Sequence, residues 1–234
     1  RKINAMDFED AFPHVMKKGG FDAVVGNPPY IRVREFREIH PAQVPYLMSK
    51  YKCATHVWDI YLLFFERAVE LTRVRGKFGF IVPIQTLHQP NCESIRRILL
   101  SRTAIYSVAD LSKLKVFDGP IVKNTIILCD KGASEEGDIA VRYPDAPINL
   151  LDQPDWMWPQ KRVYDNPGVS LKLSLLSPMK LICEKIEKLS CRMSEMYYVT
   201  FGLRSCAKGK GQGGKERLIT ATGSAKQEKP YLEG

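Results

Sequence analysis

The sequence predicts an α/β domain built on a mainly parallel sheet. Short apolar runs that stop abruptly at loop residues alternate with segments whose apolar residues recur every three or four positions. The order strand, helix, strand, helix, strand is the one in which crossover helices join parallel strands. The chain has 234 residues, 44% of them hydrophobic, so it can bury a sizeable core.

The first strand is predicted at Phe21–Gly26, with the sequence FDAVVG. This nearly continuous apolar run is typical of a buried parallel strand. Asn27, Pro28 and Pro29 follow it directly. Proline has no N–H to donate to a sheet, so the strand must stop there and a loop must begin.

An amphipathic helix is predicted next, because apolar residues recur at helical spacing from Trp58 until the pattern stops near Gly76. A second strand is predicted at 78–82, before Pro83, and a second helix from about Cys92 to Leu100. The stripe of the first helix consists of Trp58, Tyr61, Leu62, Phe65, Ala68, Val69 and Thr72.

An antiparallel hairpin is predicted at the edge of the sheet. Its strands are 105–111 and 123–129, and the short loop between them carries Phe117. One more strand is predicted at 140–143.

Residues 145–167 are rich in Pro, Asp, Asn and Trp and show no sustained period, which favours a linker or loop layer packed by Trp156 and Trp158. Ser177 and Pro178 then suit the start of a helix that runs to about Leu189. The sequence therefore predicts a first domain at 1–150, a linker with a bridging helix at 151–190, and the beginning of a second domain at 191–234.

The charge balance favours a polyanionic partner, since 35 Lys and Arg against 26 Asp and Glu give a net charge of +9. Lys208, Lys210 and Lys215 lie in a glycine-rich segment that we expect either to touch DNA phosphates or to be a solvated loop. The six cysteines and four histidines lack metal-site spacing, so we predict no metal and reduced thiols in the cytoplasm. No apolar run approaches the ~20 residues of a membrane span.

The tetrapeptide Asn27-Pro28-Pro29-Tyr30 carries the chemistry, because ligands of open α/β sheets bind just beyond the carboxyl ends of strands. The Asn27 side-chain oxygen and the Pro28 carbonyl are two acceptors for one planar amino group. Tyr30 offers a flat face on which a ring can stack. The matching ligand is an aromatic amine such as adenine; alternatively, the prolines merely end the strand and Tyr30 packs in the core.

Four segments carry a family resemblance. FDAVVGNPPYI resembles motif IV of the amino-methylating DNA methyltransferases, in the form typical of adenine-N6 enzymes of the gamma motif order. Upstream, Met6-Asp7-Phe8 is spaced as their motif III, and downstream VFDGPIVKNTIILCDKG resembles their motif VIII hairpin. The helix and strand after motif IV resemble those of the Eco57I-like and TaqI-like enzymes of type II restriction-modification systems.

The resemblance implies a partial Rossmann-like class I methyltransferase fold that uses S-adenosyl-L-methionine to methylate N6 of a flipped adenine in double-stranded DNA. It implies catalytic roles for Asn27, Pro28, Pro29 and Tyr30, and stacking of the target base on Tyr30 and Phe117. It also implies cofactor contacts from Asp7 and Phe8. A hairpin core residue at Phe117 and a helix-capping acid at Asp7 are the alternatives.

The sequence departs from the family in one respect. The Gly-rich motif I should precede Asp7, yet only six residues do. We therefore expect an incomplete catalytic domain, inactive alone, whose partner is an upstream half of the same enzyme or a nuclease domain. Residues 191–234 resemble the beginning of a TaqI-like target-recognition domain. A glutamine-N5 protein or rRNA methyltransferase and a non-catalytic DNA-binding fragment are the alternative functions.

Overall fold

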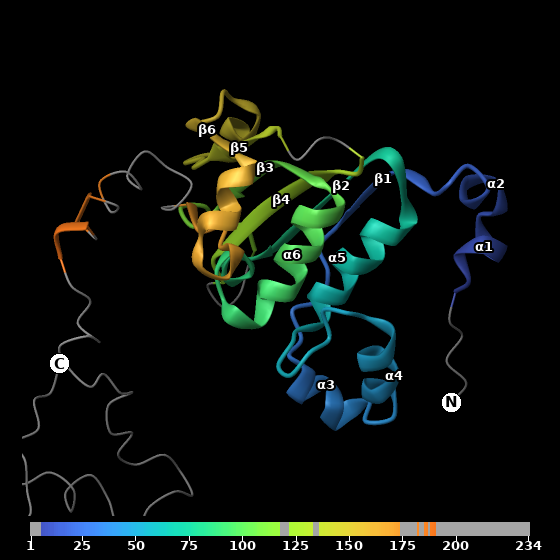
Figure 1. The fold of residues 1–234 in the computed structure, drawn as a ribbon. Coiled ribbons are helices and arrows are strands. Elements are labelled where there is room, and N and C mark those ends of the chain that lie inside the picture. Colours follow the sequence, from blue (N-terminus) through green and yellow to red (C-terminus); the bar gives the residue numbers. More distant parts are fainter. Residues whose placement is uncertain are drawn as a thin grey trace, which may run out of the picture. The chain divides into compact units, whose positions relative to one another are not determined.

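The computed structural model describes residues 6–117, 122–132 and 136–173, together with a few positions from 182 to 190. The chain divides into two compact units, Arg1–Ile182 and Cys183–Gly234. Every strand and every helix that carries a label in Figure 1 belongs to the first unit. The predicted second domain at 191–234 lies outside the described residues.

The first unit contains a six-stranded sheet of mixed direction (Figure 1). Its order is β1-β2-β4-β3-β5-β6, and only the pairs β1–β2 and β3–β5 are parallel. The α/β class is confirmed, but the expectation of a mainly parallel sheet is wrong. The strands are β1 (Phe21–Gly26), β2 (Thr72–Pro83), β3 (Ala104–Asp110), β4 (Asn124–Asp130), β5 (Asp138–Arg142) and β6 (Trp156–Pro159).

The hairpin formed by β3 and β4 is antiparallel, as predicted, but it lies in the middle of the sheet and not at its edge. On one side β4 pairs with β2, so that Ile127 faces Phe80, and on the other β3 pairs with β5, so that Val108 faces Val141. The sequence pattern shows which strands follow each other along the chain. It does not show which strands cover their outer edges.

The segment expected to be a linker contributes the last strand of the sheet. Residues Trp156–Pro159 form β6 and pair with β5, and Trp158 is only 6% exposed. The compact unit therefore continues to Ile182 and does not end near residue 150. The sequence pattern did not predict this strand, because the four residues of β6 are too few to show an alternation of apolar and polar side chains. The helix predicted from Ser177 lies largely outside the described residues, although Ile182, Ile186 and Leu189 are helical.

Helix α5 confirms the strongest helical pattern of the sequence, but it ends at Leu71, five residues before Gly76. The Thr72 hydroxyl donates to the Ala68 carbonyl at 2.7 Å, and Thr72 then pairs with Phe21 as the first residue of β2. Strand pairing thus ends the helix early. The α-helices at residues 6–117 are α1 (Phe8–Ala11), α2 (Pro13–Met16), α3 (Val33–Ile39), α4 (Gln43–Lys50), α5 (Ile60–Leu71) and α6 (Glu93–Arg102), and five short 3₁₀ segments connect other elements of the described residues.

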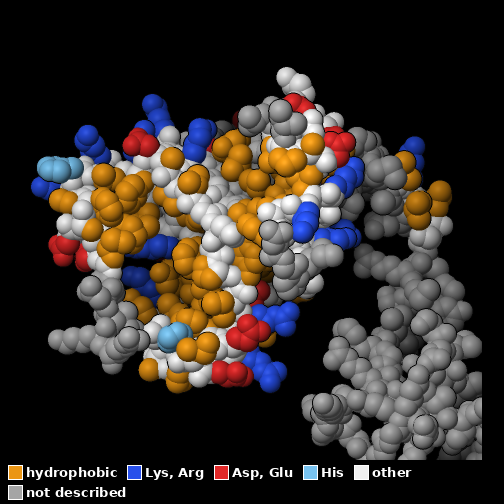
Figure 2. All heavy atoms as spheres, turned by 180° about the vertical axis from the view of Figure 1, so that it is seen from behind, with side chains coloured by type: hydrophobic (Ala, Val, Ile, Leu, Met, Phe, Trp, Pro, Cys, Tyr) orange, Lys and Arg blue, Asp and Glu red, His pale blue; other side chains and the backbone are white. Residues whose placement is uncertain are grey.

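The main core lies between the sheet and the helices α5 and α6, which pack on the same face (Figure 1). Phe80 and Ile127 are buried there, and the Phe65 ring of α5 meets the Phe80 ring edge-on, with centroids 4.9 Å apart. On the opposite face Ile126 and Leu128 remain half-buried. Figure 2, the view from behind, shows hydrophobic side chains gathered over much of its visible surface.

Candidate functional site

The Asn27–Tyr30 segment lies at the edge of the sheet where several strands end. Since β1 and β2 are parallel and β4 is antiparallel to both β2 and β3, the carboxyl ends of β1, β2 and β3 lie at this one edge. The loop after β3, which carries Phe117, therefore leaves the sheet at the edge that Asn27 occupies. At Gly26, just before the segment, an added Cβ would lie 3.1 Å from the Phe80 ring, so a larger residue would require that ring to shift.

The Asn27 side chain is exposed and makes no hydrogen bond to any described residue, whereas Pro28 beside it is buried. A burial of Asn27 in an apolar interior would have excluded a binding role. Its amide is instead available at the surface, adjacent to the Pro28 carbonyl. Two acceptors in consecutive residues can both receive protons from one amino group.

The Tyr30 ring is half-buried and held at two points. Its hydroxyl donates to the Ile81 carbonyl at 3.1 Å, and its ring meets Tyr61 of α5 edge-on, with centroids 5.9 Å apart and the planes 79° apart. Burial raises the pKa of Tyr30 to about 12, so the hydroxyl stays protonated. Part of the Tyr30 ring therefore packs against the core, as in the alternative interpretation, and part of it remains exposed.

A largely apolar groove of about 620 Å³ runs along the open edge of β1 beside α5. It brings Phe8 together with Asn27, Pro28 and Pro29, while neither Tyr30 nor Phe117 lines it. Its other walls are Phe21, Ala23, Val24, Val25, Gly26, Phe64, Arg67, Ala68, Leu71 and Phe80.

Asp7 and Phe8 have defined structural roles. One Asp7 carboxylate oxygen accepts from the Glu9 amide at 2.8 Å, which caps α1, so the helix-capping alternative holds for this oxygen. The Phe8 ring packs edge-on against Phe21, at 6.1 Å between centroids, and the Arg67 guanidinium lies 5.4 Å from the Phe8 centroid. This cation–π contact fixes the wall of the groove.

Phe117 is 44% exposed at the end of the described part of the β3–β4 loop, so it is not a buried residue of the hairpin core. Residues 118–121 lie outside the described residues, as do Lys208, Lys210 and Lys215. Phe117 thus lies in the loop that leaves the sheet at the edge where Asn27 lies.

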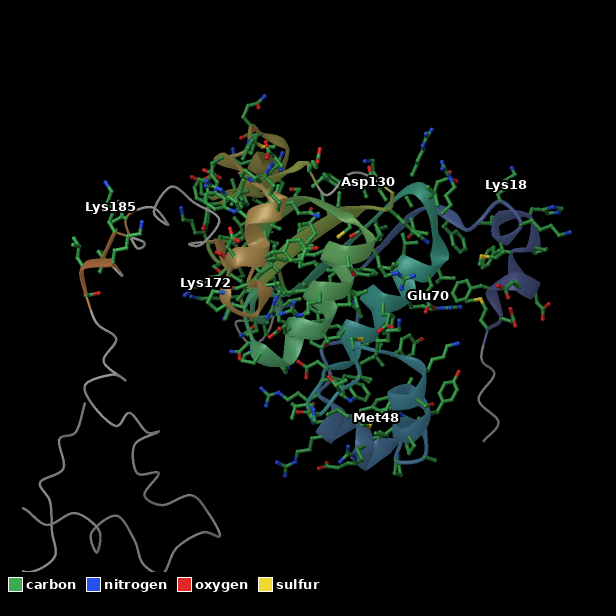
Figure 3. All side chains as sticks on the ribbon, viewed as in Figure 1. Lys18, Met48, Glu70, Asp130, Lys172 and Lys185 are labelled. Carbon is green, nitrogen blue, oxygen red and sulfur yellow. The ribbon has the colours of Figure 1, made fainter. Side chains whose placement is uncertain are left out.

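The sequence analysis missed the helical hairpin of α3 and α4, which follows Tyr30 directly; Met48 marks it in Figure 3. Two backbone hydrogen bonds close its base, from the Val33 amide to the Trp58 carbonyl at 2.9 Å and from the Ile60 amide to the Ile31 carbonyl at 2.8 Å. The buried Glu66 carboxylate accepts from the amides of residues 52 and 53. The sequence indicates these two helices only weakly, through two apolar pairs at three-residue spacing, Val33 with Phe36 and Val44 with Leu47.

Cys53, Cys92 and Cys129 are free and buried, and burial raises the pKa of the Cys129 thiol to about 12. Within the described part of the chain, no three His, Cys, Asp or Glu side chains gather at a spacing suited to a metal ion. No helix there has the length and apolar content to cross a bilayer.

The model of the family described as Eco57I restriction-modification methylase matches residues 1–117, which is half of the chain. The chain belongs to this family. It is 24% identical over 130 residues to the type II restriction enzyme and methyltransferase RM.Eco57I of Escherichia coli, and covers 13% of that protein. It is 28% identical over 131 residues to the type II methyltransferase M.PaeR7I of Pseudomonas aeruginosa, and covers 22% of it.

Among solved structures, the type IIG restriction endonuclease BpuSI matches with a TM-score of 0.52 and 16% identity, over 73% of this chain and 22% of that chain. This likeness supports the fold alone. The resemblance to Eco57I-like restriction-modification methyltransferases is confirmed, and the chain spans less than a quarter of each of these three proteins.

Proposed function

We propose that this chain is the base-binding part of an S-adenosyl-L-methionine-dependent DNA methyltransferase that modifies N6 of adenine. The observation that carries the proposal is the state of Asn27: it is exposed at the carboxyl edge of the sheet, and its amide is not engaged by any described residue. The Asn27 amide makes no contact that stabilises the fold, and it lies beside a buried proline and a fixed aromatic ring. This arrangement favours a role in ligand binding over a role in stability.

An adenine stacked in a duplex does not expose its amino nitrogen to a methyl donor. The nucleotide must therefore leave the helix, at a cost of a few kcal/mol. Stacking on aromatic side chains offsets this cost, since each base gains about 1–3 kcal/mol from such a contact. Tyr30 offers a ring that is already fixed by the Ile81 carbonyl and by Tyr61, and Phe117 is half-exposed at the same sheet edge.

Asn27 and the Pro28 carbonyl are proposed to accept the two amino protons of the base. Two acceptors hold the amine in one orientation and favour a tetrahedral nitrogen with an available lone pair, so the chemistry depends on positioning and electrostatics. No general base is required, because the nitrogen becomes acidic once it is alkylated. The high pKa of Tyr30 agrees with a purely structural hydroxyl.

S-adenosyl-L-methionine would supply an electrophilic methyl group to this site. We propose Asp7 and Phe8 as its contacts in this chain. The residues fit: one Asp7 oxygen caps α1 while the other makes no hydrogen bond to a described residue, and the Phe8 ring lines the groove that also contains Asn27. The remaining contacts are proposed to come from a Gly-rich segment upstream of Asp7.

The proposed partners are double-stranded DNA and the rest of a longer enzyme. RM.Eco57I is named as both a restriction enzyme and a methyltransferase, so a nuclease domain is one candidate for the remaining length. The open edge of β1 and the half-exposed sheet face behind it suit coverage by an upstream half of the catalytic domain. A bacterial cytoplasm is the proposed location.

The principal test replaces Asn27 by Ala in the full-length protein that carries this chain. We expect the single-turnover methylation rate to fall by about 100-fold or more, because one of two acceptors is lost, with DNA affinity changed by less than about threefold. Asn149→Ala is the control: it removes an asparagine of the β5–β6 connection that donates to Asp152, away from the site, and it should leave both rate and affinity unchanged. Equal losses of rate and affinity in Asn27→Ala would contradict the assigned role.

The second test compares two replacements of Tyr30. Tyr30→Phe keeps the ring face and loses only the bond to the Ile81 carbonyl, so most methylation activity should remain. Tyr30→Ala removes the stacking face and should lower activity at least tenfold. Both are measured by transfer of a labelled methyl group to duplex DNA, and equal rates for the two variants would reject stacking.

The same labelled donor separates the alternative functions. Transfer to a glutamine-containing protein or to rRNA, with none to DNA, would favour the other amino methyltransferases. DNA binding with steep salt dependence and no cofactor binding would favour a non-catalytic role. The basic net charge of +9 favours a nucleic acid over a protein substrate.

A further inference from the structure

Tyr61 is a buried residue of α5 that contacts the Tyr30 ring but has been given no role of its own so far. It is 1% exposed, and its ring makes a T-shaped contact with the Tyr30 ring, with centroids 5.9 Å apart. Its hydroxyl is hydrogen-bonded to the Thr86 hydroxyl at 3.2 Å and lies 3.6 Å from the Cys92 sulfur. One side chain therefore links the helix, the candidate site and the loop after β2.

The loop after β2, whose Thr86 is hydrogen-bonded to the Tyr61 hydroxyl, is fixed by further hydrogen bonds. The Thr86 hydroxyl is hydrogen-bonded to the Pro83 carbonyl at 2.7 Å. The Arg96 guanidinium, 1% exposed, donates to the carbonyls of Thr86 and Gln89 at 2.9 Å each and to that of Gly168 at 2.9 Å. A buried cation that donates to two carbonyls of this loop and to one of a distant segment leaves the loop little freedom.

The bond between Tyr30 and the Ile81 carbonyl fixes the ring only at its outer end. A ring held there alone can still rotate about the axis through its Cβ and its hydroxyl. The edge-on contact with Tyr61 removes this freedom, and the bond to Thr86 keeps Tyr61 from turning away. The plane of Tyr30 is then set before any ligand arrives.

We propose that Tyr61 is a positioning residue that fixes the ring plane of Tyr30 as a stacking surface for an extrahelical base. This inference rests on the proposed function, because it assigns Tyr30 a stacking role. Tyr61 contacts no substrate, and it acts through Tyr30 alone. Its hydroxyl matters because it anchors the ring to the loop after β2, and its ring matters because it contacts Tyr30.

The test uses the full-length protein that carries this chain and a duplex with 2-aminopurine opposite an abasic position. Quenching is the loss of fluorescence of the extrahelical base relative to the free 2-aminopurine nucleoside, and stacking on an aromatic ring causes it. Tyr61→Leu should lower the equilibrium constant for base stacking, obtained from the quenching, by about 2- to 12-fold, the range expected for one lost aromatic pair. Phe65→Leu is the matched control: it removes another buried ring of α5, one that contacts Phe80 and not Tyr30. It should destabilise the fold to a similar extent and leave the quenching near its original value.

Tyr61→Phe is the second variant, and it keeps the ring while losing the hydroxyl bond. It should retain at least half of the quenching. In the unliganded chain, aromatic ¹³C relaxation should show faster motion of the Tyr30 ring in Tyr61→Leu than in Phe65→Leu. Equal quenching and equal ring motion in these two variants would overturn the inference.

The outcomes also separate this inference from the function on which it rests. If Tyr30→Ala abolishes the quenching while Tyr61→Leu does not change it, the positioning role fails and the stacking role stands. If Tyr30→Ala leaves the quenching intact, or if the unaltered chain shows none, the stacking role fails and the positioning role fails with it.

Discussion

The two faces of the sheet are buried to different degrees, although the same strands form both. Ile127 points toward α5 and α6 and is fully buried, while its neighbour Ile126 points to the other side and is only half-buried. Phe80 and Ile81 of β2 repeat this difference. On the less covered face Val25 of the edge strand is 82% exposed.

The difference shows which face of the sheet carries the core of this unit and which face presents a surface. The covered face has a continuous core, fixed polar contacts and buried thiols, so it can stabilise the unit. The other face and the open edge of β1 retain apolar surface of the kind that proteins use to bind a partner. Asn27 lies at the end of β1. The candidate site is therefore located where the covered face, with its core, meets the less covered face and the outer edge of β1.

The largest effect is expected from Arg96 on the covered side. Arg96→Met removes the donor from the carbonyls of Thr86, Gln89 and Gly168, so the free energy of unfolding should fall by about 4 kcal/mol. Arg97→Met in the next position of α6 breaks only an exposed pair with Glu93 and should cost less than about 1 kcal/mol. Urea unfolding measures both, and similar losses would contradict the role of the buried cation.

The next effect compares the two faces directly through two neighbouring residues of identical chemistry. Ile127→Ala should lower the free energy of unfolding by about 3 kcal/mol, because it leaves a cavity against Phe80 and Val108. Ile126→Ala should cost about 1 kcal/mol or less, since its side chain is already partly in water. Equal losses in the free energy of unfolding would mean that the face carrying Ile126 is also buried in the protein in solution.

The smallest effect on stability is expected at Val25, where Lys should change the free energy of unfolding by less than about 0.5 kcal/mol. It should nevertheless reduce self-association, because a charge on an open strand edge opposes pairing with another chain. Val74→Lys, at a valine that is 66% exposed in β2 and outside the groove, is the control. Sedimentation velocity measures association, and an equal response to both changes would show that the open edge has no special role.

The sequence predicted the elements whose patterns are long or chemically distinct. Helix α5 has a long stripe, β1 ends at two prolines, and β4 is a short apolar run between polar residues. It failed for β6 and for α3, because four or seven residues are too few to establish a period. It also placed the helix end five residues late, since the pairing of Thr72 with Phe21 is a long-range contact that local spacing does not contain.

For the candidate site, the sequence identified Asn27–Tyr30 and the family, but it left Tyr61 as an ordinary core residue of a helical stripe. Its contact with Tyr30 joins positions 31 residues apart, and its bond to Thr86 joins positions 25 apart. Phe8 was assigned through the motif, and only the structure brings it into one groove with Asn27.

By itself, the amino-acid sequence determined the α/β class, the end of β1 and the order of the chemical groups around Asn27, because these depend on local spacing and on the geometry of proline. Tertiary structure decided the central position of the hairpin, the unequal coverage of the two sheet faces and the fixed plane of Tyr30. Those features depend on which distant residues come into contact, and contact across the fold is set by packing the whole core at once.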